Sequence, residues 1–139
     1  MIIAIIALLC SQTIKVIIYT IVNHRFDTSR LNGDGGMPSS HSSIVSAVAT
    51  MSALVYGISS EIFGISFVFA IIVCHDAMHS RQEIGKQAVV INKMLQDLME
   101  GEHTDKFLEE FVGHTPFQVL AGIILGIGIS ILFYFIFIV

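Results

Sequence analysis

Long apolar segments alternate with polar ones along this chain, and each apolar segment is too poor in charge for the core of a soluble protein. About 20 apolar residues are needed to cross the hydrocarbon core of a bilayer as a helix. The pattern therefore predicts an all-α fold, a polytopic membrane bundle of about four transmembrane helices that forms one domain over residues 1–139. The expected spans are residues 2–22, 42–58, 61–79 and 117–139.

The composition supports this fold class. Hydrophobic residues make up 54% of the chain and charged residues only 13%, and the mean hydropathy is +0.80, which together are typical of an integral membrane protein. The net charge of −4 and the seven Lys and Arg residues leave no basic face for nucleic acid. Cys10 and Cys74 lie inside apolar segments, where a thiol acts as a small hydrophobe, so they do not indicate a redox compartment.

The distribution of basic residues predicts the orientation in the membrane. With four spans, the polar segments 24–37 and 80–113 emerge on the same side, and they hold every Lys and Arg except Lys15. The positive-inside rule makes that side cytoplasmic and puts both termini outside the cytoplasm. A tight turn at Gly57–Glu61 would join the second and third spans as an antiparallel hairpin.

The polar segment before the last span alternates acidic and apolar residues between Leu95 and Phe111. This spacing is typical of an amphipathic helix near the membrane surface, and Gly101 would break it. The last span holds a Gly122-x-x-x-Gly126 pattern that lets another helix approach closely, which favours packing inside the bundle over a dimer interface. Because a four-helix bundle is small, neighbouring copies could still supply surface, and a homo-oligomer stays open.

The stretch from Gly36 to His41 stands where a polar segment meets the second span, and it reads Gly-Met-Pro-Ser-Ser-His. Pro38 suits the first turn of a helix, and Ser39 and Ser40 can cap that helix or offer hydroxyls. Free backbone N–H groups and the positive end of the helix dipole make such a helix start a site for an anion. The alternative is a plain helix cap, with His41 as an interfacial histidine.

A second helix start of the same design opens the last span, with Gly113-His114-Thr115-Pro116. The second and fourth spans both begin on the predicted cytoplasmic side, so the two histidines and the two helix dipoles could converge on one anionic group. One imidazole could then attack phosphorus while the other protonates the leaving oxygen. Coincidence is the competing explanation.

Cations are needed to hold a phosphate there, and the candidates include Lys15, Arg81 and Lys86. Lys15 lies within the first span, where an ammonium group must face the bundle interior or snorkel to the cytoplasmic interface. Arg81 follows the third span directly and can present two parallel donors to a phosphate. Lys86 could instead mark topology alone, as could Arg25 and Arg30.

The end of the third span reads His75-Asp76-x-x-His79, which puts two imidazoles on one helical face and is half of a metal site. No complete ligand set follows in the sequence, so a metal site is not favoured. Asp76 needs a partner inside a membrane, and it is a candidate to orient a histidine or to pair with Arg81 or Lys15.

Taken together, these segments resemble the divergent branch of the type 2 phosphatidic acid phosphatase family, also called acid phosphatase/vanadium-dependent haloperoxidase-related proteins. The resemblance runs over nearly the whole chain. It rests on residues 35–42, on Asp76 with Arg81, on Gly85–Ala88, and on Gly113–Pro116 with Val119, Gly122 and Gly126.

This resemblance implies roles for individual residues. His114 would be the nucleophile that forms a phosphohistidine, and His41 the acid that protonates the leaving group. Pro38–His41 resembles the Pro-Ser-Gly-His motif of the wider superfamily, with Ser40 in place of the glycine, while Lys15 and Arg81 resemble its phosphate-binding cations. No metal and no other cofactor are implied.

Two features depart from the superfamily pattern. The arginine and the nucleophilic histidine are close in sequence there, whereas Arg81 and His114 are separated by the acidic segment and must meet through folding. Gln118 stands where a carboxylate is expected four residues after the histidine. An amide can fix a tautomer but cannot stabilise an imidazolium as a carboxylate does, so another carboxylate substitutes or activity is low. The candidates are Asp76, Glu109 and Glu110.

The sequence thus predicts an enzyme of the cell membrane that hydrolyses a phosphomonoester on a lipid head group from the cytoplasmic side. Phosphatidylglycerol phosphate and phosphatidic acid are the expected substrates, with prenyl diphosphates as further candidates. Gln118 favours a rival interpretation, a non-catalytic membrane protein that binds phospholipid or a partner through the same anion site. A third interpretation is a metal-dependent lipid phosphotransferase that uses His75, Asp76 and His79.

Overall fold

The computed structural model describes residues 1–23, 36–98, 108 and 114–139, and within these ranges all regular structure is helical. Four of the described helices match the predicted spans to within two residues at either end, which confirms the helical fold class. A fifth helix follows the third span. The helices are α1 (Ile2–Asn23), α2 (Ser40–Tyr56), α3 (Glu61–Met78), α4 (Ser80–Leu98) and α5 (Pro116–Phe137).

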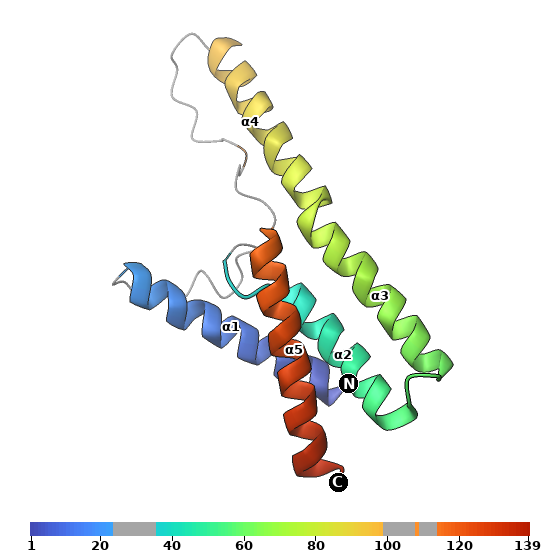
Figure 1. The fold of residues 1–139 in the computed structure, drawn as a ribbon. Coiled ribbons are helices and arrows are strands. Elements are labelled where there is room, and N and C mark those ends of the chain that lie inside the picture. Colours follow the sequence, from blue (N-terminus) through green and yellow to red (C-terminus); the bar gives the residue numbers. More distant parts are fainter. Residues whose placement is uncertain (24–35, 99–107, 109–113) are drawn as a thin grey trace.

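Helix α2 occupies the centre of the bundle, where it contacts α1, α3 and α5 (Figure 1). Small side chains line its buried face, and many of them carry hydroxyls. Side chains of this size let neighbouring backbones come close, which is how helices pack in a membrane. The buried residues of α2 are Ser42, Ser43, Val45, Ser46, Ala47, Ala49 and Ser52.

Helices α2 and α5 lie against each other and run in the same direction, and two glycines of α5 face α2. A Cβ atom at Gly122 would overlap the carbonyl oxygen of Ser39, and one at Gly126 would also overlap atoms of α2. The Ser130 hydroxyl donates to the carbonyl oxygen of Ala47 at 2.8 Å, further along both helices. The Gly-x-x-x-Gly pattern therefore packs inside the bundle, as the sequence predicts.

A short turn joins α2 to α3 as an antiparallel hairpin, which confirms that part of the prediction. Gly57 ends α2 with a φ of +86°, a conformation that glycine adopts without strain. The Ser60 hydroxyl accepts the backbone N–H of Phe63 at 3.2 Å and so caps the start of α3.

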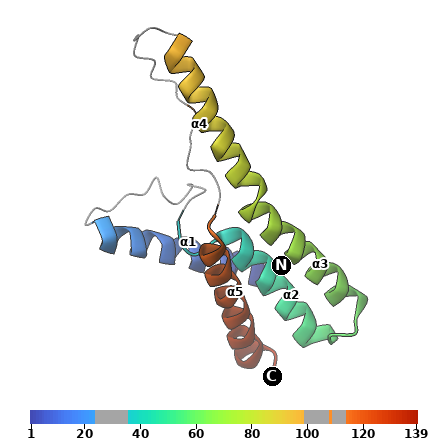
Figure 2. The ribbon, with the colours of Figure 1, turned by 45° about the horizontal axis from the view of Figure 1, so that its top comes forward.

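Helix α4 follows α3 almost without interruption and projects beyond the bundle (Figures 1 and 2). The sequence predicts an amphipathic helix between residues 95 and 111, whereas the described helix begins at Ser80, because the polar residues after the third span are good helix formers. The Asn92 side chain accepts the backbone N–H of Leu108 and donates to its carbonyl oxygen, both at 2.9 Å. These bonds hold the returning chain against α4. Gly101 lies outside the described residues.

Three helical segments of the described chain are long and apolar enough to cross a membrane: Ile2–Val22, Glu61–Gln96 and Pro116–Phe137. The second of them runs through α3 into α4. Their outward faces carry exposed isoleucine and phenylalanine side chains, as a surface in contact with lipid requires. Helix α2 has 17 residues, fewer than a span usually has, and it packs against α1, α3 and α5. The chain is thus a membrane protein, and the count of four spans stays a prediction.

Candidate active site

The start of α2 is built from hydroxyl side chains. Ser39 is the N-cap, and its hydroxyl oxygen lies 3.5 Å from the backbone N–H of Ser42, which it accepts, and 3.1 Å from the Ser42 hydroxyl. Pro38 precedes the cap and is buried, two positions before the first helical residue, whereas the sequence predicts it in the first turn. His41 lies in the first turn, so its ring is next to the free N–H groups and the positive end of the α2 dipole.

The start of α5 is capped in a second way. Thr115 is the N-cap, Pro116 opens the helix, and the Gln118 side chain completes a capping box by accepting the Thr115 backbone N–H at 3.0 Å. His114 precedes this cap and is 1% exposed. Its backbone N–H donates to the carbonyl oxygen of Ala77 at 3.1 Å, which ties the start of α5 to the end of α3.

The two helix starts meet. The backbone N–H of Ser39 donates to the carbonyl oxygen of Gln118 at 3.0 Å, and Gly122 admits the backbone of α2 to direct contact one turn further on. The rings of His41 and His114 lie 6.1 Å apart between centroids, inclined at 57°. A group between them is within hydrogen-bonding reach of both imidazoles, since each reaches about 3 Å from a ring nitrogen. The structure thus brings together the two histidines that the sequence singles out.

Gln118 contacts the ring of His114. Its Oε1 atom lies 3.3 Å from His114 Nδ1 and also accepts the backbone N–H of Thr115. Only the oxygen of the amide can accept from a backbone N–H, so this capping bond fixes which end of the amide faces the ring. An oxygen at that position favours the tautomer with the proton on Nδ1 and the lone pair on Nε2.

A family model described as the divergent PAP2 family matches residues 1–129. The chain belongs to the divergent PAP2 family. It is 37% identical over 137 residues to "Uncharacterized membrane protein YuiD" of Bacillus subtilis (strain 168), an alignment that covers 90% of this chain and 87% of that protein. No solved structure matches the chain. Membership confirms the resemblance in the sequence and relates the chain to a phosphatase superfamily.

Lys15, which the sequence comparison likens to the first cation of the wider superfamily, is buried, with 7% of its surface exposed. Its aliphatic stem lies against Gly36, where a Cβ atom would be 3.3 Å from Lys15 Cγ. Gly36 has a φ of +94°, which favours glycine. Helix α1 therefore brings a positive charge to the segment that leads into α2, and Lys15 faces the bundle interior instead of the lipid.

Two buried hydroxyls lie near His41, that of Ser40, which the sequence analysis names, and that of Ser43, which it does not. Ser40 Oγ and Ser43 Oγ are shielded from solvent and make no hydrogen bond within the part of the chain that the structure describes. Such groups cost free energy when they lack a partner, so a ligand that accepts from them would stabilise the site. The signal in the sequence is the group of serines at positions 40, 42 and 43, shortly after Pro38.

The remaining predicted residues lie on α3 and α4. Asp76 is exposed, and no hydrogen bond or ion pair joins it to another described residue; its neighbour Ala77 makes the contact with His114. Lys86 is exposed and pairs with Glu83. Arg81 lies in the first turn of α4, near the end of α3, and its side chain lies outside the described residues. Glu109 and Glu110 lie outside them as well.

The rings of His75 and His79 stack on each other, with centroids 4.4 Å apart and planes inclined at 7°. Both side chains are exposed on one face of α3. Within the described ranges, no three His, Cys, Asp or Glu side chains gather closely enough to hold a metal ion. The candidate site is therefore the histidine pair at the joined starts of α2 and α5.

Proposed function

We propose that this protein is a lipid phosphate phosphatase of the cell membrane, which hydrolyses a phosphomonoester on a lipid head group from the cytoplasmic side. The observation that carries the proposal is the pair of imidazoles, 6.1 Å apart between centroids, at two helix N-termini. Membership in the divergent PAP2 family supports the reaction class. Phosphatidylglycerol phosphate and phosphatidic acid are the substrates that we favour.

In the first step, Nε2 of His114 attacks phosphorus and the bond from phosphorus to the lipid oxygen breaks. His41 gives its proton to that oxygen, which leaves as the lipid alcohol, and His114 carries the phosphoryl group. Gln118 supports this assignment because its oxygen holds a proton on Nδ1 of His114, so that Nε2 is the attacking atom. The imidazolium that forms would be stabilised less by an amide than by a carboxylate.

In the second step, His41 takes a proton from a water molecule while the water oxygen attacks the phosphohistidine. The bond from phosphorus to Nε2 breaks, inorganic phosphate leaves, and both histidines return to their starting state.

Positive charge for the phosphate oxygens comes from the two helix dipoles, from buried Lys15 and, we propose, from Arg81 and Lys86. Ser39 and Ser40 would add hydroxyl donors. We also keep Asp76 as a proposed catalytic residue, because its neighbour Ala77 contacts the backbone of His114.

Purified protein in detergent, supplied with phosphatidic acid or phosphatidylglycerol phosphate and chelator, should release inorganic phosphate. His114→Ala should abolish the release. A matched control is His79→Ala, which removes an exposed histidine that caps the end of α3. Equal release by the parent and His114→Ala proteins would contradict the proposal. Lipid binding without turnover in the parent would instead favour the non-catalytic phospholipid-binding protein.

A further inference from the structure

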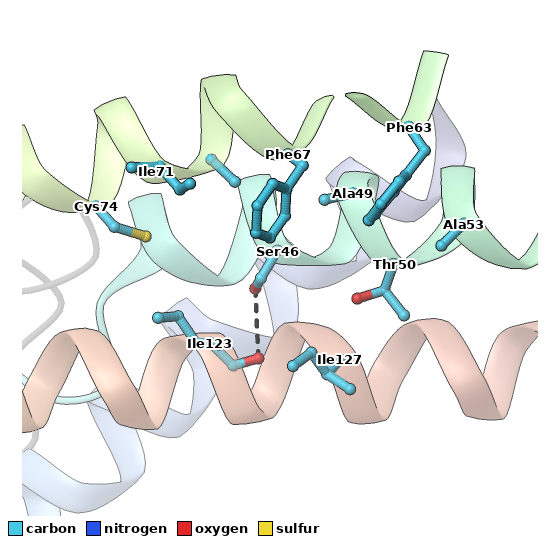
Figure 3. A pocket seen from close by; sticks show the side chains of 11 residues that line it. Ser46, Ala49, Thr50, Ala53, Phe63, Phe67, Ile71, Cys74, Ile123 and Ile127 are labelled. Carbon is cyan, nitrogen blue, oxygen red and sulfur yellow. Dashed lines mark hydrogen bonds between the residues drawn. The ribbon is translucent and has the colours of Figure 1, made fainter. Parts of the chain in front are cut away.

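An apolar groove of about 370 Å³ runs between α2, α3 and α5 (Figure 3). Its wall on α2 consists of small residues from Ser46 to Ala53, and larger side chains of α3 face them. The small side chains create the hollow, because residues of ordinary size on a central helix would fill it. Phe67 and Ile71 of α3 line the groove and are about half exposed, so its side is open between α3 and α5.

We propose that this groove binds one hydrocarbon chain of the lipid whose phosphate lies between His41 and His114. The proposal rests on the proposed function and adds where the apolar part of the substrate lies. One lipid could supply both parts, because the groove reaches Cys74, one helical turn from the residue of α3 that contacts His114.

Two contacts join the groove to the histidine pair. Cys74 lines the groove one turn before Ala77, whose carbonyl oxygen accepts the backbone N–H of His114. The Cys74 side chain also interacts with the hydroxyl of Ser42, which in turn lies against the N-cap of α2. The end of the groove at Cys74 is therefore connected to both helix starts that carry the histidines.

The length of the groove fits a lipid chain. On α3 its lining runs from Phe63 to Cys74, which at 1.5 Å per residue is about 16 Å. One leaflet contributes half of a hydrocarbon core of about 30 Å, roughly 15 Å. The groove thus has about the length of one lipid hydrocarbon chain.

The chemistry of the lining excludes a polar ligand along this length. The side chains facing the groove are apolar except for Ser46, Thr50 and Cys74. The Ser46 hydroxyl already donates to the carbonyl oxygen of Ser42 at 2.6 Å within α2. A hydrocarbon chain forms no hydrogen bonds, so this lining suits it as an occupant.

Substitutions that fill the groove at two depths test the proposal. Ala53→Phe blocks the end far from the histidines, and Ala70→Leu blocks the middle. Hydrolysis of dihexanoyl and dipalmitoyl phosphatidic acid is compared. A blocked groove should lower the rate on the long-chain lipid about tenfold, the size of an overpacking penalty, while the short-chain rate changes little for Ala53→Phe. Gly64→Leu is the matched control on α3, because a side chain there meets nothing within 4 Å.

A second measurement does not depend on turnover. Phosphatidic acid with a photoreactive diazirine in mid-chain is placed in phosphatidylcholine vesicles with the protein. Cross-links should concentrate on Ala70 and Ile127, which line the groove, over Phe69 on the lipid-facing side of α3. The pattern should persist in His114→Ala, so a failure of hydrolysis and a failure of chain binding are distinguishable.

Equal cross-linking of Ala70 and Phe69 would overturn the proposal, because the chain would then behave as ordinary surrounding lipid. An unchanged ratio of long-chain to short-chain rates in both blocked variants would also overturn it. A disulfide between two copies through Ala70→Cys, in a protein without Cys10 and Cys74, would assign the groove to a second copy of the chain instead.

Discussion

Gln118 Oε1 lies 3.3 Å from Nδ1 of His114 and at the same time caps the helix that the histidine precedes. The same amide oxygen thus accepts a backbone N–H and contacts the imidazole. The position where the wider superfamily has a carboxylate is therefore occupied by a group that can set the tautomer of the histidine but cannot share its charge. This relationship gives the sharpest prediction for the site.

Gln118→Leu should lower turnover of a lipid phosphate by roughly 10- to 100-fold, because removing a group that orients a reacting histidine has effects of that order. Gln118→Glu keeps the acceptor and adds charge, so turnover should equal or exceed that of the parent. Glutamate can also complete a capping box, so Gln118→Glu keeps the cap whereas Gln118→Leu loses it. Thermal unfolding measures the stability lost with the cap, and so separates that loss from the effect on the His114 tautomer. ¹⁵N NMR of His114 should show the Nδ1–H form in the parent and a mixture in Gln118→Leu. An Nδ1–H form retained in Gln118→Leu would count against the orienting role.

His41→Ala should affect substrates according to their leaving group. A lipid alkoxide needs a proton as it leaves, so turnover of phosphatidic acid should fall by about 10² to 10⁴. An aryl phosphate has a leaving group that needs no proton, and its first step should fall much less. Rapid mixing should therefore show a burst of phenolate in His41→Ala and no burst in His114→Ala. Equal losses on both substrates would show that His41 is not the acid.

Lys15→Met should separate stability from activity. Lys15 is 7% exposed, and replacing a buried charge by an apolar side chain of similar volume is often neutral or stabilising. The midpoint of unfolding in detergent should therefore hold or rise, while KM for the phosphate substrate rises about tenfold or more from the loss of a cation. Lys93→Met on exposed α4 is the control and should change neither quantity. Parallel loss of stability and activity would indicate a purely structural lysine.

Gly122→Ala should lower both stability and activity, because the added Cβ overlaps the carbonyl oxygen of Ser39 and pushes the starts of α2 and α5 apart. Overpacking of this kind costs about 1–3 kcal/mol. Gly128→Ala on the same helix meets nothing within 4 Å and should be neutral, or stabilising by up to about 1 kcal/mol from helix propensity. Unfolding in mixed micelles would measure the difference between the two variants. Equal stability would contradict the close approach of the two helices.

The sequence predicted the helices well because apolar length decides them. Pro116 and Ser39 stand at natural helix starts, and the ends of the predicted spans moved by two residues or fewer. The sequence predicts a helix only from Leu95, whereas α4 begins at Ser80, because polar residues after a span resemble a loop as much as a continuing helix. The pairing of His41 with His114 followed from matching helix starts on one side of the membrane.

Other parts of the site depend on tertiary packing, which the sequence does not display. A lysine in an apolar segment can face lipid or protein, and only the contact with Gly36 decides for Lys15. Gln118 could be recognised as the residue in place of a carboxylate, but its double use in a cap and at the imidazole depends on the rotamer. The groove arises from small residues of α2 lying opposite α3, a combination of distant positions.

The central place of α2 bears on how the protein is made. This helix is short and rich in hydroxyls, so it has little tendency to enter a bilayer alone, and its companions are the hairpin partner α3 and the later α5. Half of the candidate site lies on α2, and the other half lies at the start of α5, which is synthesised after α2, α3 and α4. A nascent chain stopped before residue 114 would hold His41 without its counterpart, so the two halves of the candidate site can meet only after α5 has been made and has packed against α2.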